Sequence, residues 1–287
     1  MIRWLLIVYG LTNAVLYSAL LPLWEGFDEA FHYGYVQSLA NGDWFPDVRT
    51  SVLSAEVADS FRTAPLSFVV RQSYPEVTTF SDYFASAPAH RDAVQKRLRA
   101  ILPDTRWQKS GIPNYEVHHA PLAYLLLAIP ERVLVTASLN RRVLVLRLFC
   151  AIAGMLLLFY GAELLLSEFD LPDAYKSAAI FCVLSCQMTW ATIAHVANDW
   201  LAVPLAVWTL ALLIRYWKNP QFRTAVWVAV CLSAGLLTKS YFLALVPLAL
   251  VLKRWRHSCI AAAIVLLAAG PWVCAQHQPL WVGHRNA

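Results

Sequence analysis

The chain has 287 residues, of which 59% are hydrophobic and only 14% are charged, and its net charge is +5. Soluble domains usually contain about 25% charged residues, so this composition predicts a polytopic membrane protein. The positive charge is dispersed and no basic run or RNA-binding motif occurs, which argues against nucleic acid as a partner. The sequence lacks P-loop, G-x-G-x-x-G, G-x-S-x-G and H-E-x-x-H motifs, so nucleotide hydrolysis, a Rossmann site and serine or zinc proteolysis have no support.

The first apolar segment covers residues 4–23. Arg3 before it resembles the start of a signal peptide, but the apolar run exceeds the roughly 7–15 residues of a signal-peptide core. No A-x-A cleavage site follows the run. Because the segment is long enough to cross about 30 Å of hydrocarbon, we expect a retained transmembrane helix.

Residues 24–118 form a polar stretch that holds 12 of the 18 acidic and nine of the 23 basic residues. Loops of this length are usually functional. Within it, Val94, Leu98 and Ile101 recur at helical spacing, which predicts an amphipathic helix over Arg91–Leu102.

The stretch begins with WEGFDEAFHYGY, directly after the first apolar segment. If Gly26–Leu39 is a helix, Glu25, Asp28, Glu29 and His32 share its polar face. Two interpretations stay open. The acids could simply favour the N-terminal turn of a solvated helix, or a carboxylate held beside the bilayer could deprotonate an acceptor hydroxyl that attacks a lipid-phosphate sugar.

Segment 120–135 decides the topology. Its apolar run is interrupted by Pro130, Glu131 and Arg132, and a charge at the bilayer centre costs roughly 2.5–3.5 kcal/mol. If the segment spans, the basic loops 215–223 and 253–257 lie opposite Arg3. If it lies in the interface, both loops join Arg3 in the cytoplasm, which the positive-inside rule favours. The interfacial topology places three arginines outside, namely Arg141, Arg142 and Arg147.

We therefore predict an all-α polytopic membrane protein with seven transmembrane helices and a large first extracytoplasmic loop that carries interfacial helices. The six later apolar segments are 143–166, 177–194, 200–214, 224–238, 240–252 and 258–275. The predicted regions are the first helix (1–23), the loop (24–142), helices two to seven (143–275) and a C-terminal tail (276–287). All six cysteines lie in apolar segments without a C-x-x-C pair, which predicts buried free thiols.

Four further motifs place polar groups on the predicted outer side. His118 and His119 precede Pro121, a common first-turn residue. They are interpreted either as a polar helix start or, for one histidine, as a ligand that shares a divalent metal such as Mg²⁺ or Mn²⁺ with Asp28 or Glu29.

Asn198 and Asp199 lie at the junction of two apolar segments, where they could cap a helix or belong to a site. Lys239 stands alone between two further apolar segments. Such a lysine is costly unless it reaches the interface or meets an anion, and Arg147 has the same two interpretations.

These motifs resemble, in their order, the GT-C superfamily of integral membrane glycosyltransferases. The motifs are P-L-W-E-G-F-D-E-A-F-H-Y after a first span, Y-E-V-H-H-A-P-L-A-Y-L-L, R-L-F-C-A-I-A-G, A-N-D-W-L-A and G-L-L-T-K-S-Y. The resemblance covers nearly the whole chain. It is strongest to the protein O-mannosyltransferase and aminoarabinose-transferase type, including the RgtA/B/C/D-like bacterial enzymes.

The resemblance implies inverting transfer from a polyprenyl-phosphate sugar to a glycan, lipid or protein acceptor, on the outer face of a bacterial inner membrane. It implies that Asp28 and Glu29 supply the base. It also implies that Lys239, His119, Asn198 and Asp199 contact the substrate or its phosphate. To these we add Arg147, as a second cation for the phosphate, and His32, which shares the helix face of Asp28. Family members differ in metal requirement, so no metal is carried over.

The sequence departs from that family in two respects. One proline of the His-Pro-Pro segment is missing at His119-Ala120-Pro121, and the chain is about as long as the shared membrane module alone. The chain is therefore a fragment, or the variable half is dispensable or supplied by a partner. Two alternatives remain. One is a non-catalytic relative that binds lipid-linked sugar. The other is a transporter, which Lys239 at the edge of the membrane favours, but the sequence lacks the internal inverted repeat common in transporters.

Overall fold

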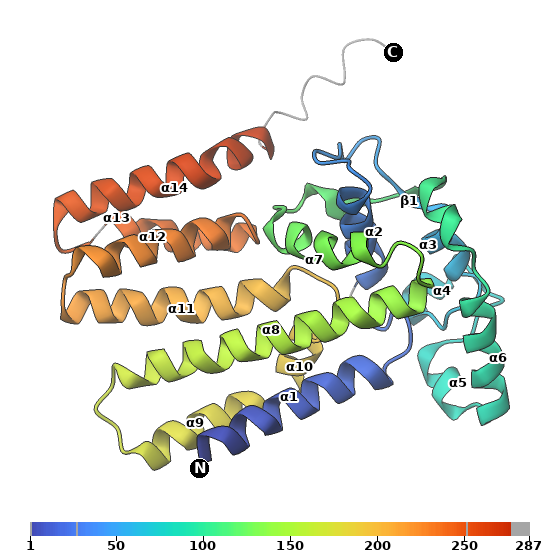
Figure 1. Ribbon diagram of the computed structural model, residues 1–287, viewed down its shortest axis with the longest axis horizontal. Helices are drawn as coiled ribbons and strands as arrows, with labels where there is room; N and C mark the ends of the chain where they lie inside the picture. The colour runs from blue at the N-terminus through green and yellow to red at the C-terminus, as the bar shows by residue number, and fades with distance from the viewer. Residues whose placement is uncertain (1, 27, 251, 277–287) are drawn as a thin grey trace, which may run out of the picture.

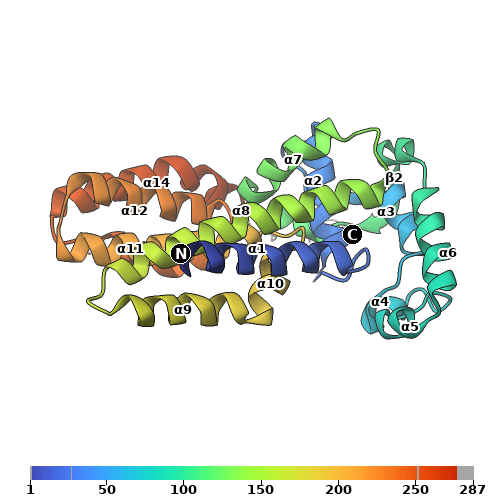
Figure 2. The ribbon, with the colours of Figure 1, turned by 60° about the horizontal axis from the view of Figure 1, so that its bottom comes forward.

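The structure is a computed structural model that describes residues 2–26, 28–250 and 252–276. It consists of a helical bundle and a loop domain (residues 21–138) that covers one end of the bundle (Figure 1; Figure 2). The bundle comprises α1 (Ile2–Leu20), α8 (Leu139–Ser167), α9 (Asp173–Ser185), α10 (Gln187–Ile193), α11 (Asp199–Lys218), α12 (Phe222–Leu236), η3 (Ser240–Leu245), α13 (Val246–Leu250) and α14 (Trp255–Gln276).

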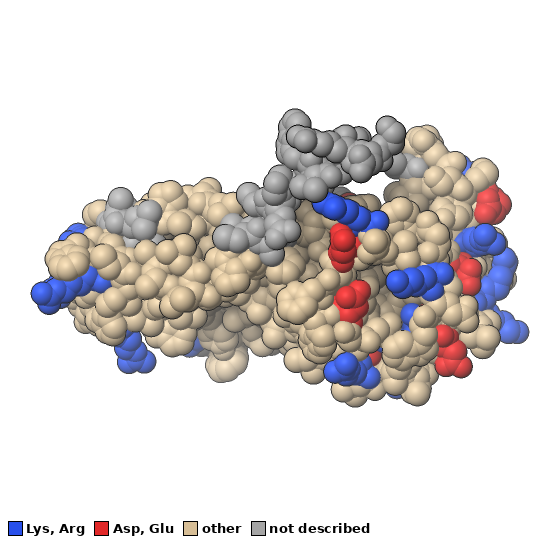
Figure 3. All heavy atoms as spheres, turned by 90° about the horizontal axis from the view of Figure 1, so that it is seen from above, with Lys and Arg blue, Asp and Glu red and all other residues tan. Residues whose placement is uncertain are grey.

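The bundle carries the membrane character of the chain. Among the described residues, α1, α8 and α11 are long and apolar enough to cross a membrane, and α12 is a shorter apolar helix. On the face shown in Figure 3, charged side chains gather at the far end of the bundle and over the loop domain, and the bundle surface between them is uncharged. This distribution fits a membrane-embedded bundle with two polar ends.

The loop domain is also mainly helical. Its elements are α2 (Glu29–Ala40), β1 (Val52–Ser54), α3 (Ala55–Ser60), α4 (Phe68–Arg71), α5 (Phe80–Ala85), α6 (Pro88–Arg99), η1 (Pro103–Trp107), β2 (Lys109–Pro113), η2 (Tyr115–His118) and α7 (Leu122–Val133). β1 and β2 pair antiparallel, with Val52 opposite Pro113 and Ser54 opposite Lys109. This two-stranded sheet is the one addition to the predicted all-α architecture in the described chain.

Two predicted loop helices are present with shifted ends. The helix predicted over Gly26–Leu39 begins at Glu29, and the amphipathic helix predicted over Arg91–Leu102 is α6, which buries Val94 and Leu98. α7 has 12 residues, so it is only about 18 Å long and is too short to span. Its Glu131 is fully buried against other polar groups, which supports the interfacial interpretation of segment 120–135.

The prediction of seven continuous spans is not matched by the helices observed. Segment 177–194 is divided at Cys186, whose backbone is extended, into α9 and α10. The hydroxyl of Thr189 donates to the Val183 carbonyl, which also accepts from the Cys186 amide, and the indole of Trp190 donates to the Leu184 carbonyl. Segment 240–252 likewise forms the short η3 and α13, not one helix.

The five cysteines whose side chains the structure describes are free, as predicted. Cys150 and Cys231 are buried, whereas Cys182, Cys186 and Cys259 lie on the bundle surface, so burial was predicted correctly for only two of them. The side chain of Cys274 and residues 277–287 of the predicted tail lie outside the described residues.

Candidate functional site

The turn between α1 and α2 has an unusual backbone. Trp24 and Asp28 both have positive φ angles, 65° and 50°, and they are the only non-glycine residues that do so in the described chain. Such conformations cost energy for a residue with a side chain and tend to occur at functional sites. Trp24 is held in place by a 2.8 Å hydrogen bond from its indole to the Ser60 hydroxyl.

Glu29, the first residue of α2, is completely buried in an ion pair with Arg147 of α8. Arg147 Nε lies 2.8 Å from Glu29 Oε1, its Nη2 contacts Oε2, and the Val196 amide donates to Oε1 at 3.0 Å. Burial alone would raise the pKa of Glu29, but the guanidinium lowers it below its usual value. Glu29 is therefore an ionised, inaccessible carboxylate that fastens α2 to the bundle.

Arg147 has little donor capacity left over for a substrate in this arrangement. Four of its five N–H groups are used: two contact Glu29, and two donate to the carbonyls of Leu21 and Pro22, each at 2.9 Å. A bidentate contact between Arg147 and a lipid phosphate would require one of these four bonds to open.

The same turn packs on the segment between α10 and α11. A side chain at Gly26 would come within 2.9 Å of the His195 ring, so only glycine fits there. Together with the bond from Val196 to Glu29, this close approach brings Asp28 and Asn198 to the same junction of bundle and loop domain.

Asp28 differs from its neighbour Glu29 in its exposure and in its hydrogen-bond partner. It is exposed, it makes no side-chain cap to α2, and its carboxylate accepts a hydrogen bond from the Tyr115 hydroxyl. Burial, followed by the charge of Asp28, raises the pKa of Tyr115. Asp28 is thus an accessible carboxylate whose position is fixed by a tyrosine.

Next to Tyr115, a cluster of imidazole and carboxylate groups links α2, η2 and α7. His32 Nδ1 lies 2.8 Å from the Tyr124 hydroxyl and 3.1 Å from Glu116 Oε2, and His119 Nε2 lies 3.0 Å from the same carboxylate oxygen. Burial lowers the pKa of His32 to about 4 although Glu116 opposes the shift. Burial acts to raise the pKa of Glu116, but the hydrogen bond from His119 and the charge of His32 lower it.

Lys239 and Asp199 form an ion pair of 2.5 Å at the end of α12 and the start of α11. Their side chains are 26% and 25% exposed, so water and ligands can reach both. The Leu122 amide donates to the Leu237 carbonyl at 2.8 Å, which places the start of α7, just after His119, against the end of α12, just before Lys239. We therefore group the pair with the imidazole cluster and call His32, Glu116, His119, Asn198, Asp199 and Lys239 the junction site.

Asn198 brings to this site a buried side-chain amide that has no hydrogen-bond partner in the described chain. It is only 1% exposed, and neither its amide nitrogen nor its amide oxygen has a partner among the described residues. It precedes α11, yet its side chain does not cap the helix as one interpretation of the sequence proposed. A buried amide left unpaired costs about 1–3 kcal/mol, so this position is suited to a ligand that provides the missing partners.

Comparison with known proteins gives a family. The model of a family described as predicted membrane protein (DUF2142) matches residues 11–278. The chain belongs to this family. No curated protein and no solved structure matches the chain. Membership in DUF2142 supports a membrane protein and says nothing of glycosyl transfer, so the GT-C resemblance stays a prediction.

In this DUF2142 protein, the structure gathers most but not all of the predicted site residues. His32, His119, Asp199 and Lys239 converge with Asn198 at the junction site, and Asp28 lies beside it through Tyr115. Glu29 and Arg147 pair with each other inside the protein. In the described residues no group of three or more His, Cys, Asp or Glu side chains could hold a metal ion, so the metal suggested for Asp28 and His119 gains no support.

Glu116, Tyr115 and Tyr124 belong to the site although the sequence predicted no role for them. Glu116 and Tyr115 lie inside the Y-E-V-H-H motif, where an acid three residues before His119 is a recognisable signal. A buried ionic cluster between the loop domain and α8 was not predicted either. In that cluster Arg142 contacts Glu56, Glu131 and the Tyr33 hydroxyl, and Arg106 lies 3.3 Å from Glu131.

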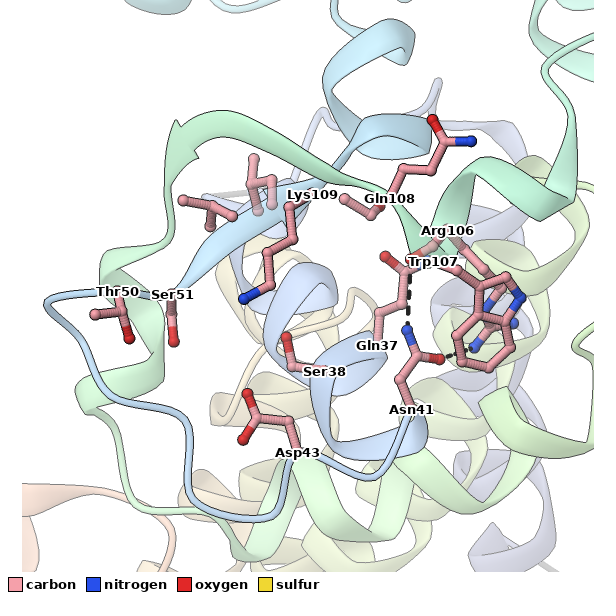
Figure 4. A pocket seen from close by; sticks show the side chains of 13 residues that line it. Gln37, Ser38, Asn41, Asp43, Thr50, Ser51, Arg106, Trp107, Gln108 and Lys109 are labelled. Atoms are coloured by element: carbon pink, nitrogen blue, oxygen red, sulfur yellow. Dashed lines mark hydrogen bonds between the residues drawn. The ribbon is translucent and has the colours of Figure 1, made fainter.

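A separate cavity of about 210 Å³ opens at the other end of α2 (Figure 4). Lys109, Ser38 and Asp43 surround it, and Asn41 is held at its edge by hydrogen bonds with Arg106. Asp28 and Asn41 are 13 residues apart along α2, or about 20 Å. This cavity therefore cannot hold a group that reacts at Asp28.

Proposed function

We propose that this chain is a membrane glycosyltransferase that moves a sugar from a polyprenyl-phosphate donor to an acceptor hydroxyl, with inversion. The observation that carries the proposal is the junction site. The accessible carboxylate of Asp28 is next to Glu29, which accepts from the Val196 amide two residues before the buried, unpaired amide of Asn198. The partly exposed Lys239 pairs with the adjacent Asp199, so these groups are linked where the apolar bundle meets the polar loop domain. A lipid-linked substrate would present its reacting bond at this boundary.

Asp28 is the general base in this proposal. Its carboxylate is exposed and oriented by Tyr115, as a base that must reach an incoming hydroxyl requires. The acceptor oxygen forms a bond to the anomeric carbon of the sugar, and its proton passes to Asp28. The bond from that carbon to the phosphate oxygen breaks, and the electron pair leaves with the phosphate. Glu29 supports the step only by anchoring α2.

Lys239 stabilises the charge that develops on the leaving phosphate. It is a better candidate than Arg147 because it is partly exposed and has Asp199 as its ionic partner, whereas Arg147 is buried and uses four of its five N–H groups to hold Glu29, Leu21 and Pro22. Asn198 would supply further hydrogen bonds to the phosphate or the sugar, since its amide has no partner in the described chain.

The topology that fits this chemistry places the loop domain outside and the N-terminus in the cytoplasm of a bacterial inner membrane, with several spans. Arg3 pairs with Glu163 and Arg215 with Glu168, so the N-terminus and the 215–223 loop share the end of the bundle that lies away from the loop domain. The positive-inside rule assigns such an end to the cytoplasm. Of the three arginines that weakened this topology, Arg142 and Arg147 are neutralised inside the protein.

The proposal is tested with Asp28→Asn in the full chain, assayed with a panel of polyprenyl-phosphate sugars. We expect transfer to fall by at least about 100-fold, the lower end of what a general base contributes, at unchanged membrane abundance. Asp59→Asn is the matched control because Asp59 is another exposed carboxylate of the loop domain, and it should retain full activity.

Near-normal transfer by Asp28→Asn would remove Asp28 from the mechanism. Binding of the lipid-linked sugar without turnover by the unaltered chain would favour the non-catalytic relative. Movement of a solute or lipid across the bilayer, lost in Lys239→Gln and kept in Asp28→Asn, would favour the transporter.

A further inference from the structure

A groove of about 470 Å³ lies where α1 ends, α8 begins and α6 packs against α8. It is distinct from the junction site. Its lining residues include Arg99 and Arg141 and contain no aspartate or glutamate. The third arginine on the groove, Arg147, is already neutralised by Glu29. The groove therefore has a net positive potential from two guanidinium groups.

The groove lies at the edge of the membrane-embedded surface. α1 and α8 are two of the helices suited to cross a membrane, and the groove is formed by the last turn of one and the first turn of the other. Leu20 and Leu144 on its wall are 72% and 37% exposed. A ligand here would meet charged groups and apolar side chains that face lipid.

The polar side of the groove is a fixed arrangement. The amide of Asn140 donates to Gln95 at 3.0 Å, and the amide of Gln95 donates to the Tyr83 hydroxyl at 3.2 Å. Because that hydroxyl accepts from Gln95, its own proton is free to be donated to a ligand. The side-chain carbonyl oxygen of Asn140 is buried and unpartnered in the described chain; as an acceptor it can bind a hydroxyl of a head group but not the phosphate itself.

The start of α8 adds further donors. Ser138 precedes this 29-residue helix without capping it by its side chain, and both Ser138 and Arg141 line the groove. The first amides of an uncapped helix and its dipole favour an anion. This effect reinforces the two arginines, which form the primary attraction.

We propose that this groove binds the phosphate of an anionic phospholipid in the leaflet that adjoins the loop domain. Guanidinium groups match phosphate oxygens in a bidentate manner, Tyr83 and the α8 amides complete the shell, and Leu20 and Leu144 accommodate the start of the acyl chains. The volume is within the roughly 300–1,000 Å³ of small-molecule sites, so it suits a head group. The bound lipid ties α6 of the loop domain to the bundle.

The test uses the purified full chain in phosphatidylcholine nanodiscs, with phosphatidylglycerol added stepwise and the melting temperature measured. We expect a saturable rise in melting temperature. The variant Arg99→Gln/Arg141→Gln should require at least about tenfold more phosphatidylglycerol, because it removes the charge-assisted hydrogen bonds. The matched control is Lys96→Gln/Arg97→Gln, which removes the same charge from exposed positions of α6 outside the groove and should follow the unaltered chain.

A parallel titration with inorganic phosphate separates the two sources of this anion. Stabilisation by inorganic phosphate equal to that by phosphatidylglycerol would overturn the lipid assignment. So would a rise that the control pair abolishes as strongly as the groove pair, because the effect would then be diffuse charge. Equal melting temperatures of all variants in pure phosphatidylcholine verify that each is folded, and Arg99→Lys/Arg141→Lys should restore part of the affinity.

Discussion

The buried ionic cluster between the loop domain and α8 and the ion pair of the junction site both join acidic to basic side chains, but in opposite environments. In the cluster, the side chains of Arg142, Glu56 and Glu131 have no exposed surface. In the junction site, Asp199 and Lys239 keep about a quarter of their side-chain surface exposed. Charges without access to water can only fix the architecture, whereas charges that keep some exposure can exchange partners with a substrate.

Removal of Arg142 should cause the largest loss of stability. Arg142→Leu leaves two carboxylates buried without their shared cation, which we expect to cost about 5 kcal/mol of the free energy of unfolding. Denaturant titration in mixed micelles measures it. Arg97→Leu, an exposed arginine on α6, is the control and should change stability by less than about 0.5 kcal/mol. A loss below 1 kcal/mol for Arg142→Leu would show that water reaches the cluster.

Loss of the anchor between α2 and α8 should have the next largest effect. Glu29→Ala leaves the Arg147 guanidinium buried and removes the acceptor of the Val196 amide, so we expect a loss of about 4 kcal/mol. Glu25→Gln is a suitable comparison, because Glu25 is near Arg147 but forms no ion pair with it among the described contacts. That variant should lose less than about 1 kcal/mol. Equal losses in the two variants would contradict the anchoring role of Glu29.

The sequence predicts the local part of this architecture well. Helical spacing located α6, and the length and charges of segment 120–135 indicated a helix that does not span. Periodicity and length succeed here because they are properties of neighbouring residues. The interfacial topology also predicted that His119, Asp199 and Lys239 lie on one side of the membrane, which stays a prediction.

The sequence could not predict which charged side chains form ion pairs with each other. Glu29 and Arg147 are 118 positions apart, and which carboxylate of the Asp28-Glu29 pair is buried depends on a single backbone turn at positive φ. The division of segments 177–194 and 240–252 was missed as well. An apolar run shows no local sign of a break when side chains such as Thr189 and Trp190 donate to the carbonyls beside it.

The stability of the folded protein should depend on pH through His32 of the junction site. Burial lowers the pKa of His32 to about 4, against about 6.5 in the unfolded chain. The folded state therefore resists protonation that the unfolded state accepts. The contribution of His32 is complete above pH 6.5 and is lost as the pH falls to 4, for a total of about 3 kcal/mol.

This prediction is tested by denaturant titration between pH 7.5 and 4 with His32→Asn beside the unaltered chain. Asparagine can still bond to Tyr124 and Glu116 but does not titrate, so the slope should be smaller in the variant. His195, whose pKa burial also lowers, remains in both chains and cancels in the difference. Identical slopes of unfolding free energy against pH would mean that His32 takes up its proton equally in the folded and the unfolded state.

Substitution of Asp28 should have the smallest effect on the free energy of unfolding. The backbone conformation at this position decides whether a substitution stabilises or destabilises the protein. Because Asp28 is exposed and has a φ of 50°, asparagine, which tolerates this conformation, should change the free energy of unfolding by less than about 0.5 kcal/mol. Alanine should cost about 1 kcal/mol through left-handed strain, and glycine should cost nothing or stabilise slightly.

The order glycine, asparagine, alanine in denaturant titrations would show that the turn itself, and no buried contact of the carboxylate, sets stability here. A loss of 2 kcal/mol or more in Asp28→Asn would place Asp28 with the architectural charges, and its loss of activity could then no longer be attributed to chemistry.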